Sequence, residues 1–281
     1  MLTVLEIIKK TTDFFAAKGI ESARLNAELL VGHALGLKRM QLYLQFERPL
    51  SEVELEKIRP LVRRRGQREP LQYITGESDF RGLKLKVDRR ALIPRPETEL
   101  LVEFAIGACT VPPARVLDLG TGSGAIALSL AREFPAAVVT AVELSDEALE
   151  LARENAAALG CAERVTFVRS NWFAELPAGA MFELMVANPP YLSADETAET
   201  ASEVKAHEPA MALTSADDGT ADLTTIVAGA SRYLSSGGVL AMETGIAQHA
   251  ELLRRVRESG FARAESRPDM TGRDRFVLAW R

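Results

Sequence analysis

An amide, two prolines and an aromatic ring stand together in the stretch Asn188-Pro189-Pro190-Tyr191. With Ala187 before it, the stretch follows the apolar run 182–186, which predicts a short buried strand. A proline has no N–H with which to continue strand pairing, and it pushes the preceding residue toward extended geometry. We therefore expect Asn188 and Tyr191 on a stiff loop at a strand end, where they can hold a planar substrate group. The alternative is an ordinary turn that ends the strand.

A glycine-rich turn, Asp118-Leu119-Gly120-Thr121-Gly122-Ser123-Gly124, lies between an expected strand and an expected helix. Its glycines stand at alternate positions, so the backbone can turn sharply and no side chain separates it from a ligand. No Gly-Lys-Ser/Thr sequence follows, which excludes a phosphate-binding P-loop, and the spacing differs slightly from the dinucleotide G-x-G-x-x-G pattern. The turn predicts a ligand site, against the alternative of a tight turn without a ligand.

Two further strand ends carry side chains suited to an adenosine-type ligand. Glu143 ends the second expected strand, where its carboxylate can accept hydrogen bonds from both hydroxyl groups of a ribose. Asn171 and Trp172 follow the third strand, so the amide could hydrogen-bond adenine while the indole packs on the ring. The alternatives are a surface carboxylate that begins the next helix and aromatic side chains that belong to the core or its rim.

The elements that position these residues alternate from Arg115 onward. The expected strands are 116–119, 138–142, 165–168, 182–186, 239–242 and 276–280, and the expected helices are 125–134, 146–159, 221–234 and 246–259. This alternation predicts an α/β fold with a doubly wound, mainly parallel sheet and helices on both faces. Ligands of such sheets bind outside the carboxyl ends of the strands, where the motifs above lie.

The N-terminal part has a different pattern. Residues 1–68 show helical periodicity, and Ser51 with Glu54 forms a capping-box signature, so a small bundle of amphipathic helices is expected. Alternating residues within 69–90 predict a linking β-hairpin. The expected domains are therefore a helical domain at 1–68, a hairpin linker at 69–90 and a catalytic domain at 91–281.

Composition and charge exclude several classes of protein. The apolar fraction of 47% and the charged fraction of 26% are ordinary for a globular protein, and no apolar run approaches the ~20 residues that span a bilayer. The net charge of −5 argues against a broad contact with nucleic acid, although the basic run 59–68 is either a local RNA or acidic-partner contact or a solvated helix end. Two cysteines and three scattered histidines predict neither a disulfide framework nor a metal site. The start of the chain lacks a signal-peptide pattern, so we expect a cytoplasmic protein.

Taken together, the glycine-rich turn, the carboxylate of Glu143 and the Asn-Pro-Pro-Tyr stretch after the fourth strand resemble the class I S-adenosylmethionine-dependent methyltransferases. The tetrapeptide has the form seen in enzymes that methylate a planar nitrogen. Over nearly its whole length the chain closely resembles the glutamine N5-methyltransferases that modify peptide chain release factors (the HemK type). The stretches Gln72–Gly76, Ile93–Glu99 and His207–Pro209 carry this resemblance too, as does the helical N-terminal domain joined through a hairpin.

The resemblance implies S-adenosylmethionine as cofactor and S-adenosylhomocysteine as its product. Gly120-Thr121-Gly122-Ser123-Gly124 would cradle the methionine part, Glu143 would hold the ribose, and Asn171 with Trp172 would hold the adenine. Asn188 would also contact the cofactor. Asn171 stands where many relatives have an acid, which could weaken the adenine contact.

The implied substrate is the glutamine in the Gly-Gly-Gln loop of class-1 peptide chain release factors, whose methylation modulates translation termination. Asn188-Pro189-Pro190-Tyr191 would bind this glutamine, with Asn188, Pro189 and Tyr191 as the catalytic residues. We expect the Asn188 side-chain oxygen and the Pro189 carbonyl to accept both amide N–H groups, while Tyr191 forms a wall of the pocket. The segment 217–223 departs from the usual family pattern.

Other functions stay open from the sequence alone. They are glutamine methylation of a large-subunit ribosomal protein, adenine N6 methylation of nucleic acid, and a non-enzymatic sensor of S-adenosylmethionine. The acidic charge balance and the lack of an obvious target-recognition domain disfavour the adenine substrate. We expect a monomer without membrane or direct nucleic-acid contact, in which the helical domain docks the release factor.

Overall fold

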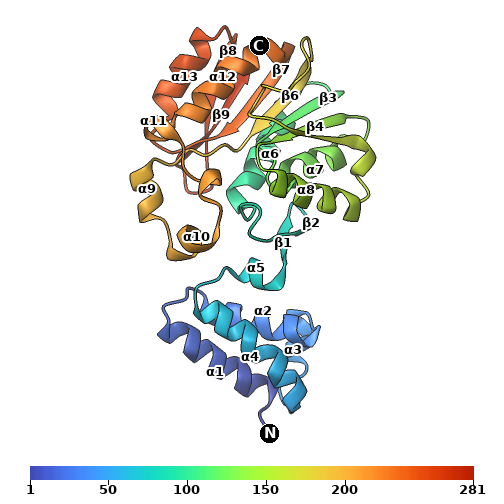
Figure 1. Cartoon of the computed structure of the whole chain (residues 1–281), viewed down its shortest axis with the longest axis vertical. Coiled ribbons are helices and arrows are strands. Elements are labelled where there is room, and N and C mark those ends of the chain that lie inside the picture. Colours follow the sequence, from blue (N-terminus) through green and yellow to red (C-terminus); the bar gives the residue numbers. More distant parts are fainter. The chain divides into compact units, whose positions relative to one another are not determined.

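The computed structural model describes residues 1–281, which fold into two compact units. The smaller unit comprises Met1–Glu77 with Ala201–His207, and the larger unit comprises Ser78–Thr200 with Glu208–Arg281. This division differs from the expected three parts, because the hairpin belongs almost entirely to the larger unit and a short segment from the C-terminal half joins the helical unit. Figure 1 labels most of the elements of both units.

The smaller unit is helical, as predicted. Its helices are α1 (Val4–Ala17), α2 (Ala23–Leu35), α3 (Arg39–Tyr43), α4 (Glu52–Gly66), α5 (Leu71–Thr75) and α10 (Ser202–His207). The capping box formed by Ser51 and Glu54 is present at the start of α4. Phe15, Leu30 and Ile58 lie in a core that these helices enclose. The helices α3, α5 and α10 were not predicted, because five or six residues are too few to show a helical period.

The basic run 59–68 makes contacts inside the smaller unit. The buried Arg65 donates to the side-chain oxygen of Asn26 at 2.8 Å. Arg65 and Arg68 both pair with Glu203 on α10, at 3.0 and 3.3 Å. Arg65 and Arg68 therefore make contacts within the smaller unit, and Arg65 is buried rather than solvated.

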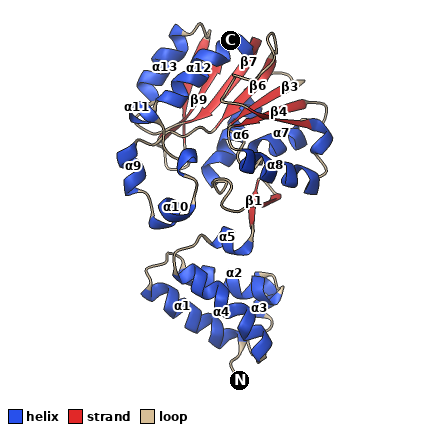
Figure 2. Cartoon of the chain, in the orientation of Figure 1, coloured by secondary structure: helices blue, strands red, loops and turns tan.

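The larger unit is built on one seven-stranded sheet, which confirms the predicted mainly parallel sheet (Figure 2). Its strands are β3 (Arg115–Leu119), β4 (Val138–Glu143), β5 (Val165–Arg169), β6 (Phe182–Ala187), β7 (Leu234–Glu243), β8 (Arg263–Pro268) and β9 (Asp274–Trp280). Their order is β5-β4-β3-β6-β7-β9-β8, with β9 antiparallel to both of its neighbours. Sequence analysis missed β8, because its polar sequence lacks an apolar strand pattern.

Helices cover both faces of this sheet (Figure 1). The helices of the larger unit are α6 (Pro96–Ala108), α7 (Ala125–Glu133), α8 (Asp146–Ala158), α9 (Ala194–Glu199), α11 (Ala216–Gly219), α12 (Ala221–Tyr233) and α13 (His249–Glu258), with 3-10 turns η1 (Ala162–Arg164) and η2 (Ala210–Ala212). The predicted hairpin is β1 (Glu77–Phe80) with β2 (Leu83–Lys86). None of the helices in the chain has the length and apolar character needed to cross a membrane.

The central strands bury both of their faces. Val116 packs in the core under α6 and α7, whereas its neighbour Leu117 packs in the core under α12 and α13. Apolar side chains on both faces are typical of a central strand in a parallel sheet that helices cover on each side. Leu119 of β3 pairs with Ala187 of β6. The strand order reverses between these two strands, so the loops that follow them flank the position where such sheets bind ligands.

Candidate functional site

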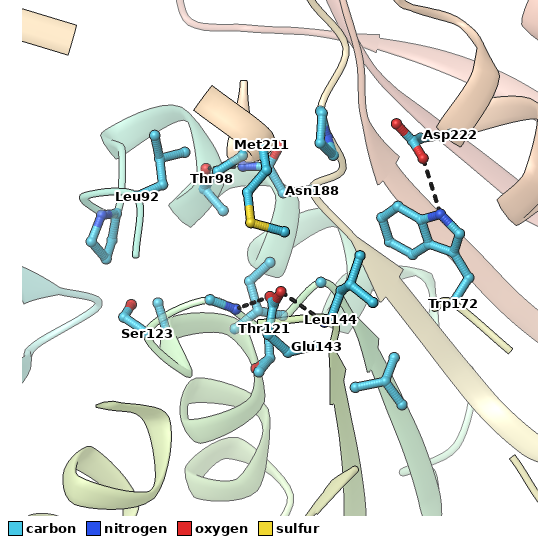
Figure 3. A pocket seen from close by; sticks show the side chains of 18 of the residues that line it. Leu92, Thr98, Thr121, Ser123, Glu143, Leu144, Trp172, Asn188, Met211 and Asp222 are labelled. Atoms are coloured by element: carbon cyan, nitrogen blue, oxygen red, sulfur yellow. Dashed lines mark hydrogen bonds between the residues drawn. The ribbon is translucent and has the colours of Figure 1, made fainter. Parts of the chain in front are cut away.

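A cavity of about 280 Å³ opens at the carboxyl ends of β3, β4, β5 and β6 (Figure 3). The predicted site residues that line it are Gly120, Thr121, Gly122, Ser123, Glu143, Asn171, Trp172, Asn188 and Pro190. Gly124, Pro189 and Tyr191 are not among its lining residues. Four separate stretches of sequence therefore meet at one cavity.

The glycine-rich turn has the backbone that its sequence predicts. Gly120, Gly122 and Gly124 all have positive φ, at 75°, 54° and 86°. A Cβ atom on Gly120 would lie 3.4 Å from the ring of Trp172, and one on Gly124 would lie 3.3 Å from Cβ of Ala152. Glycine is required here for the backbone conformation and for close packing, and it leaves the cavity wall free of side chains.

Asp118 supports the glycine-rich turn through hydrogen bonds, although it is not one of the residues that line the cavity. Its Oδ2 atom accepts the hydroxyl of Thr121 at 2.6 Å and the N–H of Ala127 at 3.0 Å, while Oδ1 is buried without a partner. Burial, with a contribution from the charge of Glu143, raises the pKa of the Asp118 carboxyl to about 7. Asp118 therefore links the turn to the start of α7.

Glu143 lies at the end of β4 and contributes its carboxylate to the cavity (Figure 3). One oxygen accepts the N–H of Gly122 at 3.0 Å, and the other accepts Leu144 and Ser145 N–H groups at 2.8 and 3.1 Å. These bonds fix the carboxylate in place. About four acceptor positions are available on a carboxylate, so Glu143 retains capacity for a ligand hydroxyl group.

Trp172 is held on the other side of the cavity by Asp222. The indole N–H donates to Oδ1 of Asp222 at 3.0 Å, and both residues line the cavity (Figure 3). Asp222 lies on α12, in the segment that departs from the family pattern, and sequence analysis did not identify it as a site residue. Asn171 lines the cavity beside Trp172.

The side chain of Asn188 is the first member of a buried hydrogen-bond network. Its Nδ2 atom donates to the hydroxyl oxygen of Thr98 at 3.0 Å, and the Thr98 hydroxyl donates to Oε2 of Glu243 at 2.8 Å. The hydroxyl of Tyr191 donates to the other oxygen of Glu243 at 3.0 Å. Thr98 and Glu243 are 4% and 2% exposed, so their hydrogen bonds are shielded from bulk solvent. Sequence analysis missed both residues.

This network has a distinct electrostatic character. Burial raises the pKa of the Glu243 carboxyl, while the bonds from Thr98 and Tyr191 and the charge of Arg275 oppose that shift. Burial and the charge of Glu243 also raise the pKa of the Tyr191 hydroxyl. Tyr191 therefore acts as a hydrogen-bond donor and not as a base at neutral pH.

Pro189 and Tyr191 support the loop through contacts with the protein interior. Pro189 is buried, and the Tyr191 ring packs against the core under α12 and α13. The carbonyl of Tyr191 accepts the side-chain N–H of Gln248 at 2.8 Å. These contacts hold the stiff loop that the two prolines predict, whereas the expected role of Tyr191 as a wall of the pocket stays a prediction.

Two further stretches of the chain, one around Arg95 and one around Glu208, meet at the cavity. Arg95 pairs with the buried carboxylate of Glu208 at 2.5 Å, and the N–H of Ile93 donates to the same carboxylate at 3.2 Å. Ile93 and Arg95 line the cavity, and Met211 lies over it (Figure 3). Sequence analysis used the stretches around Arg95 and Glu208 as motifs without assigning them a position.

The donors and acceptors of the cavity fit an adenosine-type cofactor. The bare glycine turn admits a ligand close to the backbone, Glu143 offers an acceptor for ribose hydroxyl groups, and Trp172 offers an aromatic surface. Asn188 adds an amide at the carboxyl end of β6. The cavity therefore brings contacts suited to such a cofactor next to the side-chain amide of Asn188.

Two family descriptions match the chain. "PrmC N-terminal domain" matches residues 6–76, and "Methyltransferase small domain" matches residues 97–218. The first covers the helical part of the smaller unit, and the second covers the strands that carry the glycine turn, Glu143 and Asn188.

Curated relatives resemble the chain over almost its full length. A release factor glutamine methyltransferase of Chlorobaculum tepidum is 44% identical, covering 97% of this chain and 95% of the relative. One of Geobacter sulfurreducens is 41% identical, covering 98% of this chain and 95% of the relative.

Solved methyltransferase structures share the fold over much of the chain at low sequence identity. A methyltransferase from Pyrococcus furiosus has a TM-score of 0.54 at 19% identity, covering 71% of this chain and 89% of that one. A T. thermophilus 16S rRNA N2 G1207 methyltransferase in complex with AdoMet and guanosine has a TM-score of 0.52 at 20% identity, covering 73% and 49%. At this identity, the similarity concerns the fold alone.

Proposed function

The chain belongs to the release factor glutamine methyltransferase family, and from this premise we propose that it methylates the side-chain amide nitrogen (N5) of a glutamine in peptide chain release factors. The observation that carries the proposal is the side-chain amide of Asn188 in the cavity that also contains the glycine turn and Glu143. S-adenosylmethionine supplies the methyl group and leaves as S-adenosylhomocysteine.

The cofactor contacts proposed here fall on the cavity residues. The turn Gly120–Gly124 holds the methionine part, Glu143 accepts a ribose hydroxyl group, and Asn171 with Trp172 binds the adenine. The support is their common cavity and the fixed orientation of Glu143 and Trp172. Asp222 joins this set because it fixes the indole.

Asn188 and Pro189 act on the substrate amide. An amide nitrogen is a poor nucleophile, because its lone pair is delocalised into the carbonyl group. The side-chain oxygen of Asn188 and the carbonyl of Pro189 accept the two N–H groups of the glutamine, which orients the nitrogen and favours a geometry in which its lone pair is available. The nitrogen gains the methyl carbon and loses a proton to water, so no side chain of the protein has to act as a strong base.

The helical unit is proposed to dock the release factor. Leu25 and Leu29 lie one turn apart on α2, and each is 39% exposed, so they offer an apolar contact. Replacing both by serine should raise the KM for the release factor about tenfold, with an unchanged KM for S-adenosylmethionine. Equal KM values for the factor in both proteins would reject this docking surface. A monomeric state and a cytoplasmic location belong to the same proposal.

Mass spectrometry of a release factor incubated with the protein and S-adenosylmethionine tests the proposed reaction. We expect a gain of one methyl group on the glutamine of the Gly-Gly-Gln loop. Asn188→Ala should abolish most of this turnover while S-adenosylhomocysteine still binds. An unmodified factor after incubation with a protein that binds S-adenosylhomocysteine would reject the substrate and redirect the search to ribosomal-protein glutamine and then to adenine.

A further inference from the structure

Asn188 donates a hydrogen bond to Thr98, and Thr98 donates one to Glu243. Glu243 is the final acceptor and therefore sets the direction of both bonds. Each oxygen of the Glu243 carboxylate accepts one hydrogen bond from a neighbouring hydroxyl group. Tyr191 donates to one oxygen at 3.0 Å and Thr98 donates to the other at 2.8 Å. The single hydroxyl proton of Thr98 is therefore committed to Glu243.

This commitment determines which way the Asn188 amide faces. The hydroxyl oxygen of Thr98 has no further proton to give, so toward Asn188 it can only accept. Asn188 must then present its Nδ2 group, which lies 3.0 Å from the Thr98 oxygen. The opposite side of the amide, Oδ1, makes no hydrogen bond within the protein and belongs to a residue that lines the cavity.

We propose that Thr98 and Glu243 are positioning residues that lock the Asn188 amide with its oxygen toward the substrate, and that this lock selects glutamine over glutamate. The inference rests on the proposed function. An acceptor in this position bonds the N–H of a glutamine side chain. A glutamate side chain has two acceptor oxygens, a negative charge and no N–H group. It therefore cannot donate a hydrogen bond to the Asn188 oxygen, which is itself an acceptor.

The position of Thr98 supports a role in the site over a purely structural one. Thr98 lies in the first turn of α6 and lines the cavity, yet its hydroxyl does not cap the helix. The hydroxyl instead bridges side chains from two other elements, the loop after β6 and the end of β7. Valine has nearly the same shape, so Thr98→Val removes the bridge with little change in volume. Serine keeps the hydroxyl.

The test compares two forms of one release factor, with the native Gly-Gly-Gln loop or with Gly-Gly-Glu, bound to full-length protein in the presence of S-adenosylhomocysteine. Calorimetry gives the ratio of the two Kd values for the wild type, Thr98→Val and Thr98→Ser. We expect the preference for glutamine to fall about tenfold in Thr98→Val and to be retained in Thr98→Ser, because only the valine lets the Asn188 amide turn. Affinity for S-adenosylhomocysteine should stay unchanged in all three.

A second variant keeps the test valid if Thr98→Val does not fold. Glu243→Gln retains the shape, but a glutamine side chain both donates and accepts, so it no longer dictates the direction of the network. Its preference for glutamine should also fall. An unchanged preference in the folded variants overturns the lock, and the proposed function then stands if the wild type methylates the Gly-Gly-Gln factor. A wild type that does not methylate this factor overturns both.

Discussion

The indole N–H of Trp172 donates to a carboxylate oxygen of Asp222 across 3.0 Å, and both side chains line the cavity. Trp172 has a positive φ of 50°, a conformation that few non-glycine residues adopt. Its ring lies against the backbone of Gly120, where a Cβ atom would be 3.4 Å away. Asp222 therefore fixes an aromatic ring that is attached to a strained backbone and packed on the glycine turn.

Asp222→Ala should weaken binding of S-adenosylmethionine. Loss of the carboxylate frees the indole to rotate away from the cavity, and a hydrogen bond to a charged partner contributes about 1.5–3 kcal/mol, so we expect a Kd at least tenfold higher. Asp222→Asn keeps an acceptor for the indole and should bind nearly as well as the wild type. Calorimetry on the three proteins measures this. Equal affinity in Asp222→Ala would mean that Trp172 holds its position unaided.

The part of the site that follows strand ends could be predicted from the sequence. Gly120, Glu143, Trp172 and Asn188 each come within a few residues of an apolar strand, and parallel strands bring their carboxyl ends to one edge of a sheet. Local pattern and topology together are enough to place them at one cavity.

The residues that support the site could not be predicted in this way. Thr98 lies in the first turn of α6, Asp222 at the start of α12 and Glu243 at the last position of β7. Each contacts the site through a side chain that crosses between elements, and no local spacing encodes such a contact. The one available signal was Glu243 itself, a carboxylate that ends an apolar strand just as Glu143 does.

The missed and shifted elements have similar causes. The helix expected at 246–259 begins at His249, because the side chain of Gln248 accepts the N–H of Gly245 and donates to the carbonyl of Tyr191. The helix α11 contains left-handed residues at Asp217 and Asp218, so its sequence carries no regular period. The start of α13 thus depends on a hydrogen bond to a distant segment, which local sequence patterns do not contain.

Gly124→Ala should destabilise the protein more than Gly160→Ala. Both glycines have positive φ, at 86° and 67°, so alanine costs about 1–2 kcal/mol at either position through the backbone alone. At Gly124 the new methyl group also lies 3.1 Å from Leu128 and 3.3 Å from Ala152, whereas nothing lies within 4 Å at Gly160. Thermal unfolding should show a drop of a few degrees in Gly160→Ala and a larger drop in Gly124→Ala. Equal drops would show that the packing around Gly124 relaxes freely.

Asp118 should make stability depend on pH. Its folded-state pKa is raised to about 7 from an ordinary 3.8, so between these values the folded protein binds a proton that the unfolded chain has lost. The stabilisation is fully present below the lower value and is lost as the pH rises through the upper one. Asp118→Asn lacks this titration, so it should become more stable relative to the wild type by a few kcal/mol as the pH rises. Urea unfolding at about pH 5 and about pH 8 measures the difference, and parallel changes in both proteins would contradict the assignment.

Turnover should fall on the acidic side of the pH profile because Glu243 takes up a proton there. Burial raises its pKa above the ordinary 4.5 of a glutamate, against the opposing effects of Thr98, Tyr191 and Arg275 and with a small contribution from the charge of Glu97. When Glu243 takes up a proton it can donate to Thr98, which then donates to Asn188 and turns the amide oxygen away from the substrate. Turnover should therefore fall as the pH drops through this raised pKa.

The profile of kcat against pH for the wild type and Glu243→Gln separates this titration from others in the protein and in the release factor. Glu243→Gln should turn over more slowly near neutral pH, because its side chain no longer dictates the direction of the network. Its kcat should then lack the acidic limb, since glutamine does not titrate. An identical limb in both proteins would assign the titration to another group and would leave the direction of the Thr98 hydrogen bond independent of pH.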